Sequence, residues 1–265
     1  MKNFYSSFYL AFTFLTRLPL PFSKYIVYSE ENMAESTAFY PLIGLFYGII
    51  SYLTYIAVQA VLLPPVPASI IITAVPYIIN RFFHIDGLLD SLDGMLSDRC
   101  QEERLKIMKD SRIGTFAFVG GFLFLSARIA LTEEILKTHM AVLLLLLIPV
   151  LSRTSLTVSA YFGTYPGSAG LGKTIIGKIK PLTMVTALIF YLLITVSICF
   201  FKTNIIFIFF LLLCSAVWIA IFQFYCYRKI GGITGDTLGA LCETTELIAL
   251  IFGLLWLLKG INYVK

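Results

Sequence analysis

The chain has 265 residues, of which 58% are hydrophobic and 13% charged, and its formal net charge is +5. Soluble domains contain about 45–50% apolar and about 25% charged residues, so this composition excludes a soluble globular protein, a disordered chain and a secreted disulfide scaffold. The sequence predicts an integral membrane protein. With only two Trp and no basic-aromatic tract, it gives no indication of nucleic-acid binding.

The hydropathy pattern predicts an all-α, polytopic bundle of transmembrane helices that forms one integral membrane domain over residues 1–265. The N-terminal segment 4–20 is either a further span or a helix lying in the membrane interface. A transmembrane helix needs about 20 apolar residues. Seven runs approach or exceed that length, at 38–63, 66–82, 113–131, 138–162, 182–201, 203–227 and 238–258.

The basic residues of the connections indicate an orientation. If 21–37 is cytoplasmic and the seven spans alternate, twelve Lys and Arg lie on the cytoplasmic side and four on the other, as the positive-inside rule requires. Three polar segments then share the cytoplasmic face: 81–112, 163–181 and 228–237. We therefore expect a multi-pass protein of the cytoplasmic (inner) membrane, whose active site faces the cytoplasm and is built from these segments.

The first polar segment contains three regularly spaced acids. Asp86, Asp90 and Asp93 follow the spacing i, i+4, i+7, so a helix places all three on one face. Their mutual repulsion calls for a cation, and hard carboxylate oxygens suit Mg²⁺ or Mn²⁺. The alternative is a solvated acidic helix face, but polar residues at a membrane boundary are costly and usually functional. Gly87 and Gly94 flank the acids, and their lack of a side chain would let a phosphate-bearing ligand approach. His84 is either a base or an interfacial residue that bonds locally.

The segment continues into a run of charges that precedes the next span. Lys109, Asp110 and Arg112 stand directly before Gly114. An arginine suits bidentate phosphate contacts, and the N-terminus of a span is a natural anion site. We therefore expect phosphate contacts here.

The last polar segment is rich in glycine and leads into the final span. Its Thr234 and Asp236 predict a phosphate or metal cradle. Glu243 lies further along the span, with Glu246 one turn later; ionisable pairs at such depth usually face a polar interior or a partner. Arg153, in the middle of another span, is a candidate partner or substrate ligand. Arg128 is expected to snorkel towards the opposite face.

Several stretches, taken together, closely resemble the cobalamin synthase family, whose members act as adenosylcobinamide-GDP ribazoletransferases. The pair HIDGLLDSLDG (84–94) and MKDSRIGTF (108–116) carries most of the resemblance. The other matching stretches occur in family order along the chain and are FLTRLP (14–19), FYPLIG (39–44), GLG (170–172) and GITGDTLGA (232–240), followed by Glu243.

This resemblance implies the final assembly step of the cobamide nucleotide loop. The expected substrates are adenosylcobinamide-GDP and α-ribazole or its 5′-phosphate, GMP is the expected leaving group, and Mg²⁺ is the expected cofactor. The protein is expected to lie in the lipid bilayer, either as a monomer or as a homo-oligomer.

The resemblance and the residues together suggest a role for each candidate. We expect Asp86, Asp90 and Asp93 to hold Mg²⁺ on the diphosphate. The proton of the ribazole hydroxyl would go to Asp93, Asp110 or His84. The remaining candidates would bind substrate: Lys109, Arg112, Arg153, Thr234, Asp236 and Glu243.

The alternative function is another Mg²⁺-dependent membrane transferase. A CDP-alcohol phosphotransferase also uses an Asp cluster at the membrane face, but its pattern has an Ala-Arg pair after the first Asp-Gly, and this chain has Leu88-Leu89 there. An intramembrane prenyltransferase needs two Asp-rich motifs, and only one is complete here.

Overall fold

The computed structural model describes residues 2–21, 26, 28–167, 170–199 and 205–262, and this part of the chain contains helices and turns but no strand. The predicted all-α class is therefore confirmed. Three basic residues that contribute to the orientation argument, Lys24, Lys202 and Lys265, lie outside the described residues. The helices, including two short 3-10 turns, are α1 (Lys2–Thr16), α2 (Glu30–Ser36), η2 (Thr37–Phe39), α3 (Tyr40–Ala60), α4 (Pro65–Ile79), α5 (Phe83–Leu96), α6 (Gln101–Ile107), α7 (Thr115–Leu136), α8 (Ala141–Phe162), η3 (Leu171–Thr174), α9 (Pro181–Cys199), α10 (Ile205–Ile230) and α11 (Gly235–Asn262).

Six helical segments of the described chain are long and apolar enough to cross a membrane, and α4 with α5 makes a seventh if this bent pair counts as one span. The run 66–82 does not form a straight span by itself. Its helix α4 has 15 residues, or about 22 Å at 1.5 Å per residue, against a hydrocarbon core of about 30 Å. The chain then turns by 93° into α5 through Arg81 and Phe82, both in the left-handed region with φ of 51° and 62°. Such residues end helices.

Helix α1 also has 15 residues, which is short for a transmembrane helix. Of the two alternatives for segment 4–20, the interfacial helix fits this length better. The helix is fixed to the bundle by the Tyr47 hydroxyl, which donates a hydrogen bond of 2.9 Å to the Leu15 carbonyl.

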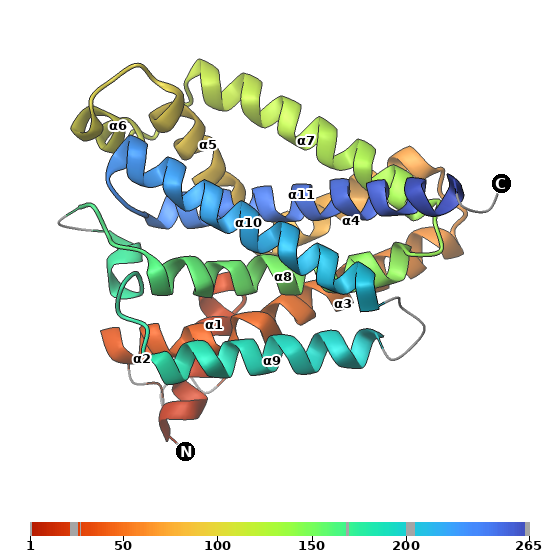
Figure 1. The fold of residues 1–265 in the computed structure, drawn as a ribbon, viewed down its shortest axis with the longest axis horizontal. Coiled ribbons are helices and arrows are strands. Elements are labelled where there is room, and N and C mark those ends of the chain that lie inside the picture. Colours follow the sequence, from red (N-terminus) through yellow and green to blue (C-terminus); the bar gives the residue numbers. More distant parts are fainter. Residues whose placement is uncertain (1, 22–25, 27, 168–169, 200–204, 263–265) are drawn as a thin grey trace.

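The long helices run back and forth between two ends of the bundle, with α8 in the middle (Figure 1). The connections 97–114 and 231–234 and the described parts of the α8–α9 connection, 163–167 and 170–180, gather at one end, which we call the polar end. There the Ile233 amide donates to the Thr164 carbonyl at 2.9 Å, and Arg104 donates to the Lys229 carbonyl at 3.0 Å. The structure thus brings together the three polar segments that the sequence assigns to one face.

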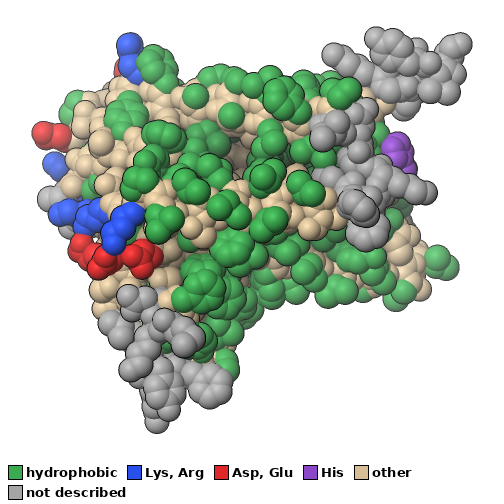
Figure 2. All heavy atoms as spheres, turned by 60° about the horizontal axis from the view of Figure 1, so that its bottom comes forward, with side chains coloured by type: hydrophobic (Ala, Val, Ile, Leu, Met, Phe, Trp, Pro, Cys, Tyr) green, Lys and Arg blue, Asp and Glu red, His purple; other side chains and the backbone are tan. Residues whose placement is uncertain are grey.

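The outer surface suits a bilayer. Figure 2 shows hydrophobic side chains covering the visible length of the bundle, with Lys, Arg, Asp and Glu gathered at one end. Large apolar side chains that face outwards include Phe118 and Phe122 of α7, Leu192 of α9 and Phe209 of α10, each more than half exposed. The buried face of the central helix α8 supplies core residues such as Leu144 and Val150, which are fully buried.

Candidate active site

A cavity of about 520 Å³ opens at the polar end of the bundle. Its wall is built from α1, α3, α5, α7, α8 and α11, together with the α6–α7 and α8–α9 connections. Its volume lies within the range of about 300–1,000 Å³ that is typical of small-molecule sites. Ion pairs of Lys178 with Glu30, and of Lys180 with Glu31 and Glu35, attach the α8–α9 connection to α2.

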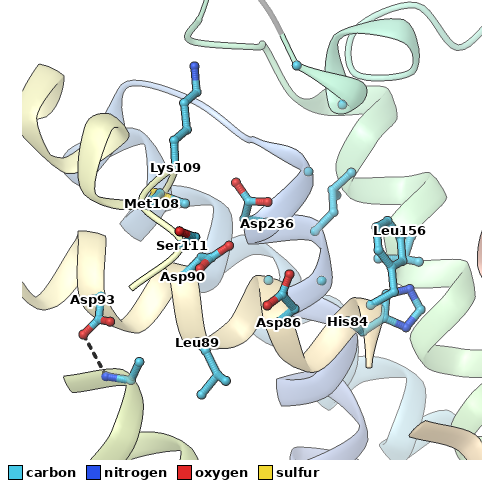
Figure 3. Close-up of a pocket in the computed structure, with 18 of the residues that line it drawn as sticks. His84, Asp86, Leu89, Asp90, Asp93, Met108, Lys109, Ser111, Leu156 and Asp236 are labelled. Carbon is cyan, nitrogen blue, oxygen red and sulfur yellow. Dashed lines mark hydrogen bonds between the residues drawn. The ribbon is translucent and has the colours of Figure 1, made fainter. Parts of the chain in front are cut away.

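Helix α5 presents its acids as the spacing predicts, and α11 adds another. Asp86, Asp90 and Asp93 all line the cavity, and Asp236 lines it from the first turn of α11. Figure 3 shows Asp86, Asp90 and Asp236 grouped together, with Asp93 further along α5.

Close crossing of α5 and α11 brings Asp236 to this group. A Cβ atom at Gly87 would lie 2.7 Å from the Asp236 carbonyl oxygen, and a Cβ at Gly239 would lie 2.9 Å from the His84 carbonyl oxygen. Any side chain at either position would push the helices apart. Gly87 also lines the cavity, so the expectation that it leaves room for a ligand stays a prediction. Gly94 does not line the cavity and makes room for α6, whose Arg104 carbonyl would lie 3.0 Å from a Cβ there.

The start of α11 is fixed by reciprocal hydrogen bonds. The Thr237 amide donates to the Thr234 hydroxyl oxygen at 3.2 Å, and the Thr234 amide donates to the Thr237 hydroxyl oxygen at 2.8 Å. This arrangement satisfies amides that a helix N-terminus otherwise leaves without partners. Thr234 is buried and does not line the cavity, so its part in the site is to hold the turn that carries Asp236.

Asp93 has partners of its own. Its carboxylate accepts hydrogen bonds from the Gly114 amide at 2.6 Å and the Ala117 amide at 2.8 Å (Figure 3 draws one such bond from Asp93). It therefore caps the N-terminus of α7, where a carboxylate is also favoured by the helix dipole. The sequence predicts an anion site at this N-terminus, and the structure fills that site with the protein's own carboxylate.

The connection between α6 and α7 supplies the cations. Lys109 and Arg112 line the cavity together with Asp110. Arg112 donates from its backbone and its guanidinium to the Asp110 carboxylate, with an ion-pair distance of 2.6 Å. These hydrogen bonds lower the pKa of Asp110 to about 2, so this carboxylate is a weak proton acceptor at neutral pH.

The two ends of the cavity differ in chemistry. Lys109 and Ser111 lie at one end and His84 and Leu156 at the other, with Asp86 and Asp236 between them (Figure 3). His84 is 2% exposed, and its Nδ1 lies 3.6 Å from the Cys242 sulfur. The structure thus leaves His84 beside Asp86, at the boundary between polar and apolar lining.

Two predicted substrate ligands lie away from this cavity, within the membrane-spanning bundle. Arg153 and Glu243 are 2% and 1% exposed, respectively, and neither lines it. Arg153 pairs with Glu246. Of the two alternatives for Arg153, the structure therefore shows the partner of the buried glutamates.

The expectation for Arg128 is wrong. Its side chain does not extend to the surface but is 9% exposed and pairs with both Glu243, at 2.6 Å, and Glu246. The Tyr77 hydroxyl donates to Glu243 at 2.7 Å, and the Ser152 hydroxyl donates to Glu246 at 2.9 Å. Two buried cations thus balance two buried anions, which is the arrangement that makes charge tolerable inside a membrane protein.

The carboxylates that line the cavity offer the oxygen donors that a divalent cation prefers, and the predicted ligand set of Asp86, Asp90 and Asp93 stays a prediction. In the described part of the chain, Asp86, Asp90 and Asp236 form no ion pair with Lys or Arg. No three His, Cys, Asp or Glu side chains among the described residues are close enough to share one ion. Mg²⁺ is commonly bound by one or two carboxylates together with substrate phosphates and water, so the donor set fits an ion that arrives with a diphosphate.

Sequence reasoning missed part of the lining. Phe14, Leu15 and Tyr40 line the cavity from α1 and α3. All three belong to stretches that carry the family resemblance, and this was the available signal. Their spacing alone does not separate them from ordinary core residues.

Comparison with known proteins identifies the family of the chain. The family model described as cobalamin-5-phosphate synthase matches residues 7–254. Similar proteins named adenosylcobinamide-GDP ribazoletransferase occur in Clostridioides difficile (34% identity; 92% of this chain and 95% of the relative), Clostridium novyi (34%; 91% and 94%) and Syntrophobacter fumaroxidans (34%; 93% and 97%). No solved structure matches the chain. The extent of the family match and the identity to these relatives show that the chain belongs to the cobalamin-5-phosphate synthase family.

Proposed function

We propose that this chain has the activity for which its relatives are named, the transfer of a ribazole to adenosylcobinamide-GDP. A ribose hydroxyl of α-ribazole, or of its 5′-phosphate, attacks the phosphorus that is bonded to the cobinamide. The bond from that phosphorus to the bridging oxygen breaks, and GMP leaves. The observation that carries the proposal is the grouping of Asp86, Asp90 and Asp236 with Lys109 in one cavity.

One or two of the carboxylates of Asp86, Asp90 and Asp236 would hold Mg²⁺, with oxygens of the diphosphate completing its coordination. When bound, the ion neutralises phosphate charge and makes GMP a better leaving group. Asp93 supports the site by fixing the N-terminus of α7 against α5. It thereby also positions the connection that carries Lys109 and Arg112.

The basic residues and His84 would complete the chemistry. Lys109 and Arg112, at the mouth, bind phosphate oxygens as charge develops on the leaving group. Of the three candidate proton acceptors, Asp93 is engaged by backbone amides and Asp110 is engaged by Arg112. We assign the proton of the ribose hydroxyl to His84, which lines the cavity beside Asp86 (Figure 3).

The assay for this function is GMP release. Purified protein reconstituted in lipid should release one GMP for each corrinoid product when given adenosylcobinamide-GDP, α-ribazole and Mg²⁺. Removing Mg²⁺ with a chelator should stop the reaction, and adding it back should restore the rate. Absence of product under these conditions, with folded protein, would refute the proposed activity.

We further propose that the polar end faces the cytoplasm, in a cytoplasmic membrane. The excess of basic residues in the connections at that end supports this orientation. Single cysteines introduced at Asp98 and Lys173, in a variant lacking the exposed Cys100, should react with a membrane-impermeant thiol reagent only when the cytoplasmic side is accessible. A cysteine at Lys137, at the opposite end, is the matched control and should react from outside. The reverse pattern would invert the topology.

A further inference from the structure

The two ends of the cavity have to hold different parts of the reacting pair. In an in-line displacement at phosphorus, the attacking and leaving oxygens lie on opposite sides of the phosphorus atom. In the proposed function, His84 receives the proton of the attacking hydroxyl, and Lys109 binds the leaving phosphate. Asp86 and Asp236 lie between these two residues (Figure 3). The ribazole therefore occupies the His84 end, and the GMP part of adenosylcobinamide-GDP lies towards Lys109.

Most of the aromatic lining belongs to the His84 end. The described Phe and Tyr residues that line the cavity are Phe14, Tyr40, Phe83 and Tyr165. The centroid of the Phe83 ring lies 5.2 Å from that of Phe14 and 5.5 Å from that of His84. Tyr40 packs in the same apolar cluster as Phe14. Three of these four rings are thus gathered beside the place where the ribazole would lie.

Tyr165 stands apart from that group, on the connection between α8 and α9. Its side chain is half-buried and lines the cavity at the polar end of the bundle. Burial and the nearby Asp236 carboxylate raise the pKa of Tyr165, which keeps its hydroxyl neutral beside the first turn of α11. In Figure 3, Asp236 lies next to Lys109. Tyr165 is therefore the lining ring on the side where GMP leaves.

The surrounding backbone holds this ring in place. The Thr164 amide donates to the Tyr227 hydroxyl at 2.8 Å, and the Thr164 carbonyl accepts the bond from α10–α11 described above. A Cβ at Gly170 would overlap the Tyr165 hydroxyl, and one at Gly167 would lie 3.1 Å from its ring. Gly170 also has a φ of 151°, which side chains other than that of glycine rarely permit. The turn is thus shaped around the Tyr165 ring.

We propose that the Tyr165 ring stacks on the guanine base of adenosylcobinamide-GDP and of the GMP that leaves. This inference rests on the proposed function. Tyrosine offers a flat face to a nucleobase, and stacking leaves the polar edges of guanine free to meet water and polar groups at the mouth of the cavity. A benzimidazole is also flat, but its ribose has to reach His84, and three other rings already adjoin that end.

The test compares two ligands that differ only in the base. Equilibrium dialysis of labelled GMP, with Mg²⁺ and with ribose 5-phosphate as the competitor, gives both values of Kd. Tyr165→Leu should reduce the preference for GMP by about 10-fold, as expected for the loss of one base–aromatic stack. The KM for adenosylcobinamide-GDP should rise by a similar factor, while the KM for α-ribazole stays unchanged. Tyr165→Phe keeps the ring and should keep the preference.

Tyr161→Leu is the matched control. Tyr161 packs against the same apolar cluster as Tyr165 and is similarly exposed, but it does not line the cavity. The variant should therefore keep the full preference for GMP. Gly170→Ala should lower the preference, because the added methyl group displaces the Tyr165 ring.

The outcomes separate this inference from the proposed function. If Tyr165→Leu keeps the preference for GMP, or if Tyr161→Leu loses it equally, the guanine subsite is wrong. A rise in the KM for α-ribazole with an unchanged preference would instead place the ribazole base on Tyr165. If the wild-type protein prefers GMP through Tyr165 but releases none from adenosylcobinamide-GDP, the proposed function fails and the nucleotide subsite stands.

Discussion

Asp90→Asn should lower kcat for GMP release by about 10³-fold or more while leaving the fold intact. Asp90 lies between Asp86 and Asp93 on the face of α5 that lines the cavity, close to Asp236 (Figure 3). An amide cannot neutralise a divalent cation, and a metal ion contributes several kcal/mol of charge stabilisation in the transition state. A loss of about 4 kcal/mol corresponds to about 10³ in rate.

Two matched variants make this measurement specific. Asp98→Asn makes the same change on an exposed aspartate outside the cavity and should leave kcat unchanged. Asp93→Asn should cost about 1 kcal/mol of stability through the weakened cap of α7, with a smaller loss of kcat than Asp90→Asn. Full activity of Asp90→Asn at ordinary Mg²⁺ would contradict its role, and equal losses at Asp90 and Asp93 would restore the predicted ligand set.

Local periodicity explains what the sequence predicted well. The spacing of Asp86, Asp90 and Asp93 depends only on helix geometry, and α5 contains all three. The meeting of the three polar segments follows from alternation, because an even number of passes returns the chain to the same end of the bundle. Neither inference requires knowledge of which helix touches which.

Contacts between distant helices explain what the sequence did not predict. Asp236 reaches the acids of α5 only because Gly87 and Gly239 let two helices cross closely. Asp93 is drawn to the amides at the start of α7, 21 and 24 residues along the chain. Sequence spacing carries no information on contacts between distant helices. It therefore predicted the helix face on which the acids lie, but not the groups from other helices that each acid meets.

The same limit applies to Arg128. Within its own helix it has no acidic neighbour one turn away, and a lone arginine in a span usually snorkels. Its actual partners lie 115 and 118 residues later in the chain. The correct signal was on the other helix, where Glu243 and Glu246 stand one turn apart in an apolar run and require cations.

Glu246→Gln should destabilise the protein strongly, although Glu246 does not line the active-site cavity. The substitution leaves Arg128 and Arg153 buried together with Glu243 as the one remaining carboxylate of this cluster. Breaking a buried ion pair from one side costs about 3–5 kcal/mol, because the remaining charge has no partner. For a chain of this size, we expect the unfolding temperature in detergent to fall by about 10 °C.

The surface pair of Glu134 with Lys137 provides the control, because its ion-pair distance is 2.7 Å but both side chains are about half exposed. Glu134→Gln should cost less than about 1 kcal/mol, as exposed ion pairs do. Adding Arg153→Gln to Glu246→Gln restores equal numbers of buried positive and negative charges, so the double variant should regain part of the loss. If Glu246→Gln unfolds at the same temperature as Glu134→Gln, the buried network contributes nothing to stability. If the double variant is no more stable than the single one, the loss comes from packing rather than from uncompensated charge.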